Sequence, residues 1–139
     1  MKKSTNVSHL INEPKYNAGE GRPQLLRIEF SSEFTKVDFG HQTTSYYIRG
    51  GWVRISKDTF IRIKVTGEKY TLTGAENIPI APVYHNFNTS KDWLYFSLYF
   101  PAIEFKSGKI DLIEDEPGDA TDFNYYDIVI DSKKGIELK

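Results

Sequence analysis

Apolar residues recur at every second position over much of this chain, and this period of two constrains the fold more than any other feature. It is clearest in GGWVRISKDTFIRIKVTGEKY, residues 50–70, which is interrupted by turn residues at Lys57 and Asp58 and again at residues 66–69. An amphipathic helix needs apolar residues about every 3.6 positions, so this segment predicts a meander of antiparallel strands. The residues expected to face a core there are Val53, Ile55, Ile61, Ile63 and Val65.

Short alternating runs continue on both sides of this segment, with Gly, Pro, Asn and Asp between them. In the run at residues 24–30, Leu26, Ile28 and Phe30 are expected on the buried face. The pattern predicts about nine strands in a single all-β domain over residues 23–139. A two-sheet antiparallel sandwich is the expected architecture, and a barrel is the alternative. Residues 1–22 are expected to form a flexible N-terminal arm.

Composition excludes several classes of function. The chain has no cysteine, which excludes disulfides, thiolate zinc sites, iron–sulfur clusters and thiol nucleophiles. The net charge is −1, which gives no overall field to attract nucleic acid or an anionic membrane. No apolar run approaches the roughly 20 residues needed to cross a bilayer, so no membrane span is expected. The N-terminus lacks the apolar core of a signal peptide, which predicts a cytoplasmic protein, or one of the cell envelope or extracellular space if a leader has been removed.

Part of the chain resembles a known family. The phrase YTLTGAENIP and the nearby strand patterns resemble an uncharacterised β-rich accessory domain of exported bacterial proteins, sometimes found with thioredoxin-like domains. The matching pieces lie at residues 52–55, 59–61, 70–79, 96–101 and 111–114, within about half of the chain. The resemblance implies an immunoglobulin-like sandwich without catalytic activity, and it carries over no binding residue.

Aromatic side chains are the first candidates for ligand binding. The chain has nine Tyr, nine Phe and two Trp residues, and exposed rings offer the flat apolar face on which a sugar can stack. Two packed sheets also need aromatic residues for their core, so most of these rings are expected to be buried. Trp93, beside a turn, is the best candidate for a glycan site, with Trp52, Tyr95 and His85 as further candidates.

Acidic residues are concentrated between residues 110 and 132, where no Lys or Arg occurs. Carboxylates in a glycine-containing loop could hold calcium, which takes six to eight oxygen ligands. The EF-hand spacing is absent, and a solvated loop that discourages edge pairing is the alternative. The candidate metal ligands are Glu114, Asp115, Asp119 and Asp122.

Basic residues on neighbouring strands are interleaved with aromatic ones, a combination that single-strand nucleic-acid binders use for phosphates and bases. Asp58 and Glu68 lie among them and the whole chain is close to neutral, so a solvated face is expected and no nucleic-acid partner. The residues of this basic group are Arg49, Arg54, Lys57, Arg62, Lys64 and Lys69.

Catalytic motifs are absent from the sequence: it contains no H-E-x-x-H, no G-x-S-x-G and no phosphate-binding loop. No catalytic residue is therefore predicted, although His85 could meet a loop carboxylate such as Glu76. In LTGAENIP, Gly74 is expected in a turn with positive φ, and the phrase is expected to cross between the two sheets. The sequence predicts a non-catalytic accessory or protein-interaction domain without a cofactor. Its expected partner is an unknown protein or a glycan. The alternative function is a carbohydrate-binding module that could also hold a structural calcium ion.

Overall fold

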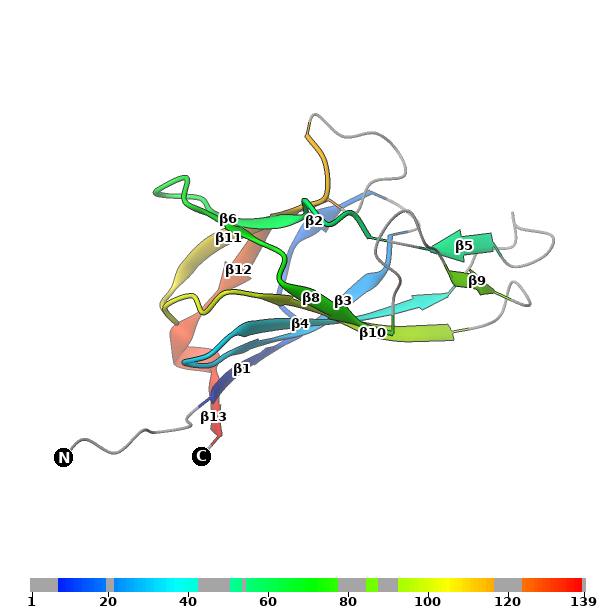
Figure 1. The fold of residues 1–139 in the computed structure, drawn as a ribbon. Coiled ribbons are helices and arrows are strands. Elements are labelled where there is room, and N and C mark those ends of the chain that lie inside the picture. Colours follow the sequence, from blue (N-terminus) through cyan, green and yellow to red (C-terminus); the bar gives the residue numbers. More distant parts are fainter. Residues whose placement is uncertain are drawn as a thin grey trace.

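The chain folds into two antiparallel β-sheets packed face to face (Figure 1). The computed structural model describes residues 8–19, 22–42, 51–53, 55–77, 85–87, 93–116 and 124–138. Within these ranges the sole helical element is a 3-10 turn at Ser132–Lys134. No helix in the described ranges has the length and apolarity needed to span a bilayer. The predicted all-β two-sheet sandwich is confirmed.

The first sheet has six strands and contains both the first and the last strand described. Each strand is antiparallel to its neighbours, so the sheet is held by hairpins and by long-range pairing. The longest ladder joins β4 and β10 over eight paired positions, from Thr35–Phe100 to Gln42–Trp93. In spatial order the strands are β13 (Ile136–Leu138), β1 (Ser8–Asn12), β3 (Gln24–Phe30), β4 (Thr35–Gln42), β10 (Trp93–Phe100) and β8 (Gly74–Glu76).

The second sheet has five strands and covers the first. Its order is β2 (Asn17–Ala18), β12 (Tyr125–Ile130), β11 (Gly108–Ile113), β6 (Phe60–Ile63) and β7 (Lys69–Thr71). A separate two-stranded ribbon pairs β5 (Gly51–Val53) with β9 (His85–Phe87).

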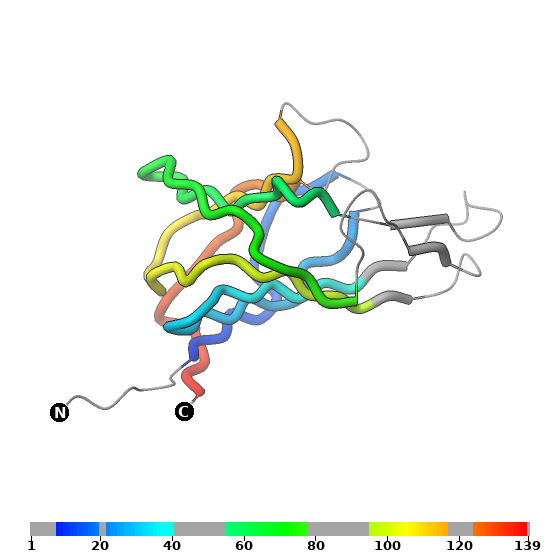
Figure 2. The backbone as a smooth tube through the Cα atoms, in the orientation of Figure 1, coloured from blue at the N-terminus to red at the C-terminus, as the bar shows by residue number. Residues whose placement is uncertain are grey.

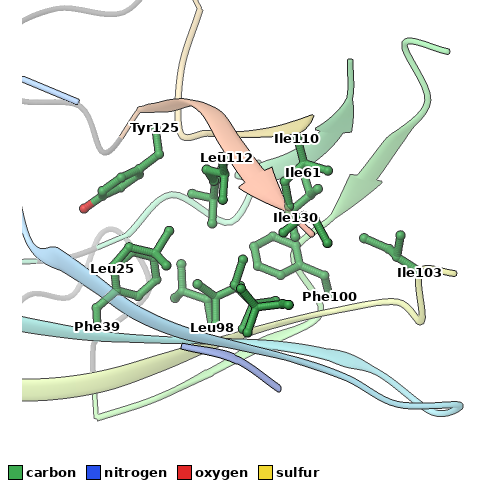
Figure 3. Packing of buried hydrophobic residues seen from close by; sticks show 14 of the residues in the cluster. Leu25, Phe39, Ile61, Leu98, Phe100, Ile103, Ile110, Leu112, Tyr125 and Ile130 are labelled. Carbon is green, nitrogen blue, oxygen red and sulfur yellow. The ribbon is translucent and has the colours of Figure 1, made fainter. Parts of the chain in front are cut away.

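The hydrophobic core lies between the inner faces of the two sheets (Figure 3). Tyr125, Leu25 and Phe39 gather toward one end of the view, and Phe100, Ile130 and Ile103 toward the other. Strand alternation is the reason for this layer, because every second side chain of each strand points to the same face. The buried residues that the six-stranded sheet contributes include Leu25, Ile28, Phe30, Val37, Phe39, Phe96, Leu98 and Phe100. Those that the strands of the five-stranded sheet contribute to the core cluster are Ile61, Ile110, Leu112, Tyr125, Ile128 and Ile130.

Aromatic stacking connects the two sheets inside this core. The rings of Phe39 and Phe96 stack with centroids 5.0 Å apart, and Phe39 also lies 5.4 Å from the ring of Tyr125 in the opposite sheet. The Tyr125 hydroxyl donates a 2.6 Å hydrogen bond to the carbonyl oxygen of Pro23. Burial raises the pKa of Tyr125 well above its usual value, so the hydroxyl stays a donor. This tyrosine therefore fills the core without leaving a buried polar atom unpaired.

The phrase LTGAENIP does cross between the sheets, as predicted. The Leu72 amide donates to Thr59 of the five-stranded side, whereas the next amide, that of Thr73, donates to Tyr99 of β10. Strands β7 and β8 are thus nearly continuous and border both sheets at one edge. The expected positive φ at Gly74 is wrong: in this phrase it is Asn77 that has a φ of 63°. Asparagine tolerates the left-handed region, so it can end β8 with a change of chain direction.

Two predicted core positions differ from the structure. Leu25 is buried in place of Leu26, because a register shift between Leu25 and Arg27 opposite β4 moves the alternation by one residue. Val65 is 85% exposed, because it lies in the turn of the β6–β7 hairpin and not on a strand.

Residues expected in the N-terminal arm also enter the sandwich. Strand β1 lies between β13 and β3, and β2 pairs with β12 at the edge of the second sheet. Short strands of two to five residues carry too little alternation to be seen in the sequence, which is also why thirteen strands are described where about nine were expected.

Candidate functional site

The β6–β7 hairpin and the connection from β10 to β11 lie at the same end of the sandwich (Figure 2). An apolar pocket is lined by residues of both segments. Its volume is about 130 Å³. The connection from β10 to β11 turns the side chain of Ile103 into the core. The apolar residues that line the pocket are Phe30, Ile63, Val65, Tyr70, Ile103, Ile110 and Ile130.

Charged residues of both signs surround the mouth of this pocket. Lys64 is held by Asp111 and Asp127, with both Nζ–O distances at 3.2 Å. Lys106 and Lys109 also line the pocket, and neither forms an ion pair within the described part of the chain. The remaining charged lining residues are Glu68 and Glu104. The apolar floor is therefore bordered by a polar rim, the usual arrangement at protein interfaces.

The size of the pocket decides what it can hold. Pockets for drug-sized ligands and cofactors enclose about 300–1,000 Å³. An engineered apolar cavity of about 150 Å³ binds benzene, so a cavity of this size suits one large apolar side chain. Val65, exposed in the hairpin turn, adds apolar surface at the lip of the pocket.

A second candidate surface is the outer face of the six-stranded sheet, where Tyr95 is 61% exposed. Tyr95 lies directly opposite Gly40 in the β4–β10 ladder. A Cβ atom at Gly40 would be 3.2 and 3.4 Å from two ring carbons of Tyr95, and 3.4 Å from Leu26. The ring thus lies over the backbone of Gly40, where any larger residue would push it away from the sheet.

Polar side chains continue this outer face beside Tyr95. The Asp38 carboxylate is central: it accepts a hydrogen bond of 2.9 Å from Arg27 Nε and one of 2.6 Å from the Ser97 hydroxyl. Lys36 Nζ lies 3.9 Å from the same carboxylate. Arg27 and Lys36 thus share Asp38 as an ionic partner on this face.

Tyr99 follows on the same strand, two residues after Ser97. Its hydroxyl donates a 2.5 Å hydrogen bond to the Glu76 carboxylate, which, with burial, raises the pKa of Tyr99 to about 12. The Phe34 ring meets its edge at 5.5 Å, and Lys36 Nζ lies 5.8 Å from its centroid. These contacts hold the Tyr99 ring in place. They also give a hydrogen-bond partner to Glu76, the carboxylate that His85 could meet if the protein were an enzyme.

Ion pairs join the side chains of Asp111, Arg62, Lys64 and Glu116 on the outer face of the five-stranded sheet. Asp111 is 0% exposed, and its carboxylate accepts hydrogen bonds from Arg62 and from the backbone amide of Asp127. Arg62 also forms two hydrogen bonds to Glu116. The solvated loop expected for the acidic stretch is therefore wrong at Asp111, because long basic side chains from β6 and the turn after it cover this residue. The hydrogen bonds that Arg62 donates to Glu116 and Asp111 raise the pKa of Arg62 above its usual value.

The candidate calcium ligands are only partly placed by the structure. Glu114 accepts a 2.9 Å hydrogen bond from the Ser56 amide. The Asn124 side chain binds the backbone amides of Glu114 and Asp115, which orders the start of the acidic segment. Asp119 and Asp122 lie outside the described residues. Among those described, no group of three or more His, Asp or Glu side chains could hold a metal ion.

The predicted aromatic candidates fall on two elements. Trp52 and His85 occupy neighbouring positions of the β5–β9 ribbon, where Trp52 pairs with Asn86 and His85 with Val53. Trp93 begins β10 and pairs with Gln42. The side chains of all three lie outside the described part of the structure, so Tyr95 is the one candidate whose ring can be placed.

Sequence reasoning missed the pocket, because its lining comes from strands distant in the chain. A signal existed for Gly40, which interrupts an alternating strand at a position where a glycine often marks a close approach. Comparison of the chain with protein-family models, with curated proteins and with solved structures finds no match.

Proposed function

We propose that this protein is a non-catalytic interaction domain that holds one apolar side chain of a partner protein in the pocket between the β6–β7 hairpin and the β10–β11 connection. The observation that carries the proposal is the pocket itself, about 130 Å³ in volume and lined by Ile, Phe and Tyr. An accessory role in an exported bacterial protein, with an immunoglobulin-like strand arrangement, is part of the same proposal and rests on the sequence resemblance.

Three properties of the pocket support a protein partner. The cavity is too small for a typical cofactor but large enough for a leucine or phenylalanine side chain. Its rim carries Lys106, Lys109, Glu68 and Glu104, and polar rims that exclude water surround the anchor residues of protein interfaces. Val65 at the lip offers further apolar area to the segment that follows the anchor.

A pocket-filling substitution tests the proposal. A phage-displayed peptide library is selected on the purified domain, and the enriched peptides are synthesised and titrated by fluorescence anisotropy. We expect them to share one large apolar residue, and we expect Ile63→Phe, which places a ring in the pocket, to weaken their binding by about 10- to 100-fold. That range is the effect of losing about 1.5–3 kcal/mol from one buried side chain.

Two further variants complete this test. Val65→Asp changes only the exposed lip and is expected to weaken binding without affecting the fold. Leu138→Asp changes an exposed apolar residue on β13, in the other sheet, and is expected to leave binding unchanged. Failure to enrich any peptide, or equal affinity of the wild type and Ile63→Phe, would contradict the proposal.

A further inference from the structure

We infer that the outer face of the six-stranded sheet is a second binding surface, on which a neutral oligosaccharide stacks one sugar ring on Tyr95. This inference is independent of the pocket, which lies at the end of the sandwich and is lined by none of the residues of this face. It concerns a ligand of a different chemical class from the proposed protein partner.

The position of the Tyr95 ring is the first reason. Gly40 lies directly across from Tyr95, and two ring carbons lie within 3.4 Å of the place where a Cβ atom would be. The ring therefore rests against the sheet through one part of its surface while 61% of the residue stays accessible. Leu26 lies beside the same glycine and limits the ring on a further side. A ring supported in this way loses little freedom when a ligand covers it, which favours binding.

Exposure distinguishes Tyr95 from Tyr99, the other tyrosine that β10 places on this face. Both tyrosines project from the outer face of β10, on either side of Ser97. The Tyr99 ring has Phe34 at its edge and Lys36 within 5.8 Å of its centroid, and its hydroxyl is bound to Glu76. Among the tyrosines of this face that the structure describes, Tyr95 is the one that is largely exposed.

Polar groups suited to hydroxyl ligands lie next to the ring. Ser97 follows Tyr95 by two residues, a separation of about 7 Å along a strand, and its hydroxyl is held by Asp38. Arg27 uses Nε on the same carboxylate, and its guanidinium has further N–H groups that can donate to a ligand. Donors and acceptors beside an apolar ring match the mixed surface of a sugar, whose faces are apolar and whose edge carries hydroxyl groups.

The charge of this face favours an uncharged ligand. Asp38 is paired with Arg27 at 2.9 Å and approached by Lys36 at 3.9 Å, so these cations already have a carboxylate partner. A charged ligand would have to compete with these contacts, whereas a neutral glycan can accept or donate hydrogen bonds without breaking them. The ligand class is therefore a neutral oligosaccharide, long enough to reach from Tyr95 to Ser97 and Arg27.

Substitution of the ring tests this inference. The purified domain is applied to an array of neutral and acidic oligosaccharides, and the neutral ones it retains are titrated by isothermal calorimetry. We expect Tyr95→Ala to weaken binding by about tenfold or more, and Tyr95→Phe, which keeps the stacking surface, to stay within about threefold of the wild type. Gly40→Ala, which displaces the ring, is expected to weaken binding while leaving Tyr95 in place.

Control variants separate this surface from others. Phe60→Ala removes a partly exposed ring from the outer face of the five-stranded sheet and is expected to leave glycan binding unchanged. Ile63→Phe, which fills the pocket, is likewise expected to have no effect on it. Retention of no neutral oligosaccharide on the array, preference for acidic ones, or equal affinity of the wild type and Tyr95→Ala would overturn the inference. Because Tyr95 is largely exposed, its alanine variant is expected to fold, which circular dichroism verifies.

Discussion

Replacing Asp111 by asparagine is expected to lower the free energy of unfolding by about 3 kcal/mol, the lower end of the range for breaking a buried ion pair. The carboxylate is 0% exposed and binds Arg62, Lys64 and the backbone amide of Asp127. Asparagine keeps the shape but turns an N–H₂ group toward two cations. The loss stays near the lower end because the side chains of Arg62 and Lys64 are 22% and 40% exposed and can gain water. Urea denaturation followed by circular dichroism measures the difference.

The effect of Asp111 is expected to depend on pH. Burial by itself would raise the pKa of Asp111, but hydrogen bonds from the Asp127 amide, Arg62 and Lys64 outweigh it and hold the pKa below the ordinary 3.8. A carboxylate with a lowered pKa in the folded state stabilises the fold above its unfolded pKa, and this contribution is lost as the pH falls through the folded pKa. The stability gap between the wild type and Asp111→Asn should therefore be constant from about pH 7 to pH 5 and shrink below about pH 4.

The exposed members of the same cluster provide the control for Asp111. Glu116→Gln removes a carboxylate that also binds Arg62 but lies at the surface, where an ion pair contributes about 0–1 kcal/mol. We expect Glu116→Gln to lower stability by less than about 1 kcal/mol. Equal losses in the two variants would show that the burial of Asp111 has no energetic role.

Replacing Phe39 by alanine is expected to lower the free energy of unfolding by about 3–5 kcal/mol, as large-to-small changes of buried phenylalanine do. Its ring stacks on Phe96 in the neighbouring strand and contacts Tyr125 of the opposite sheet. The substitution would open a cavity at the place where the two sheets meet through aromatic rings. Urea denaturation measures the loss, and a change in midpoint without a change in slope would show that the unfolded state is unaffected.

Phe39→Leu is the matched control for the core, because leucine fills much of the same space but cannot stack. We expect it to lose clearly less stability than Phe39→Ala. If both variants lost less than about 1 kcal/mol, Phe39 would not be packed as the structure shows.

Much of the fold followed from local alternation, but the candidate sites did not. The pairing of Val37 and Phe39 against Lys36 and Asp38 was predictable because side chains alternate along any strand. The bulge that buries Leu25 was not, since it depends on the register with β4. Nor was the burial of Asp111, whose cover comes from β6, nearly fifty residues away along the chain.

The candidate surfaces show the same limit. Tyr95 could be named from the sequence because a strand tyrosine is a plausible stacking residue, yet only the β4–β10 register puts Gly40 beneath it. The pocket required even more, because Ile63 and Ile130 are brought together by the β6–β11 and β11–β12 pairings, and Phe30 comes from the opposite sheet. A local sequence pattern predicts which residues alternate along a strand. It does not contain the register between distant strands, on which both candidate sites depend.

The pairing of β1 with β13 has a consequence for the order in which the molecule can be made. Ser8 pairs with Leu138, so this ladder joins segments separated by almost the whole described chain. Ladders of such sequence separation form slowly, because a large loop must close before any contact stabilises it. During synthesis, β1 is available as soon as it leaves the ribosome, but β13 follows all the other strands. Until then, one border of β1 stays open to other chains, and prompt binding by a chaperone would protect the nascent protein from aggregation at that border.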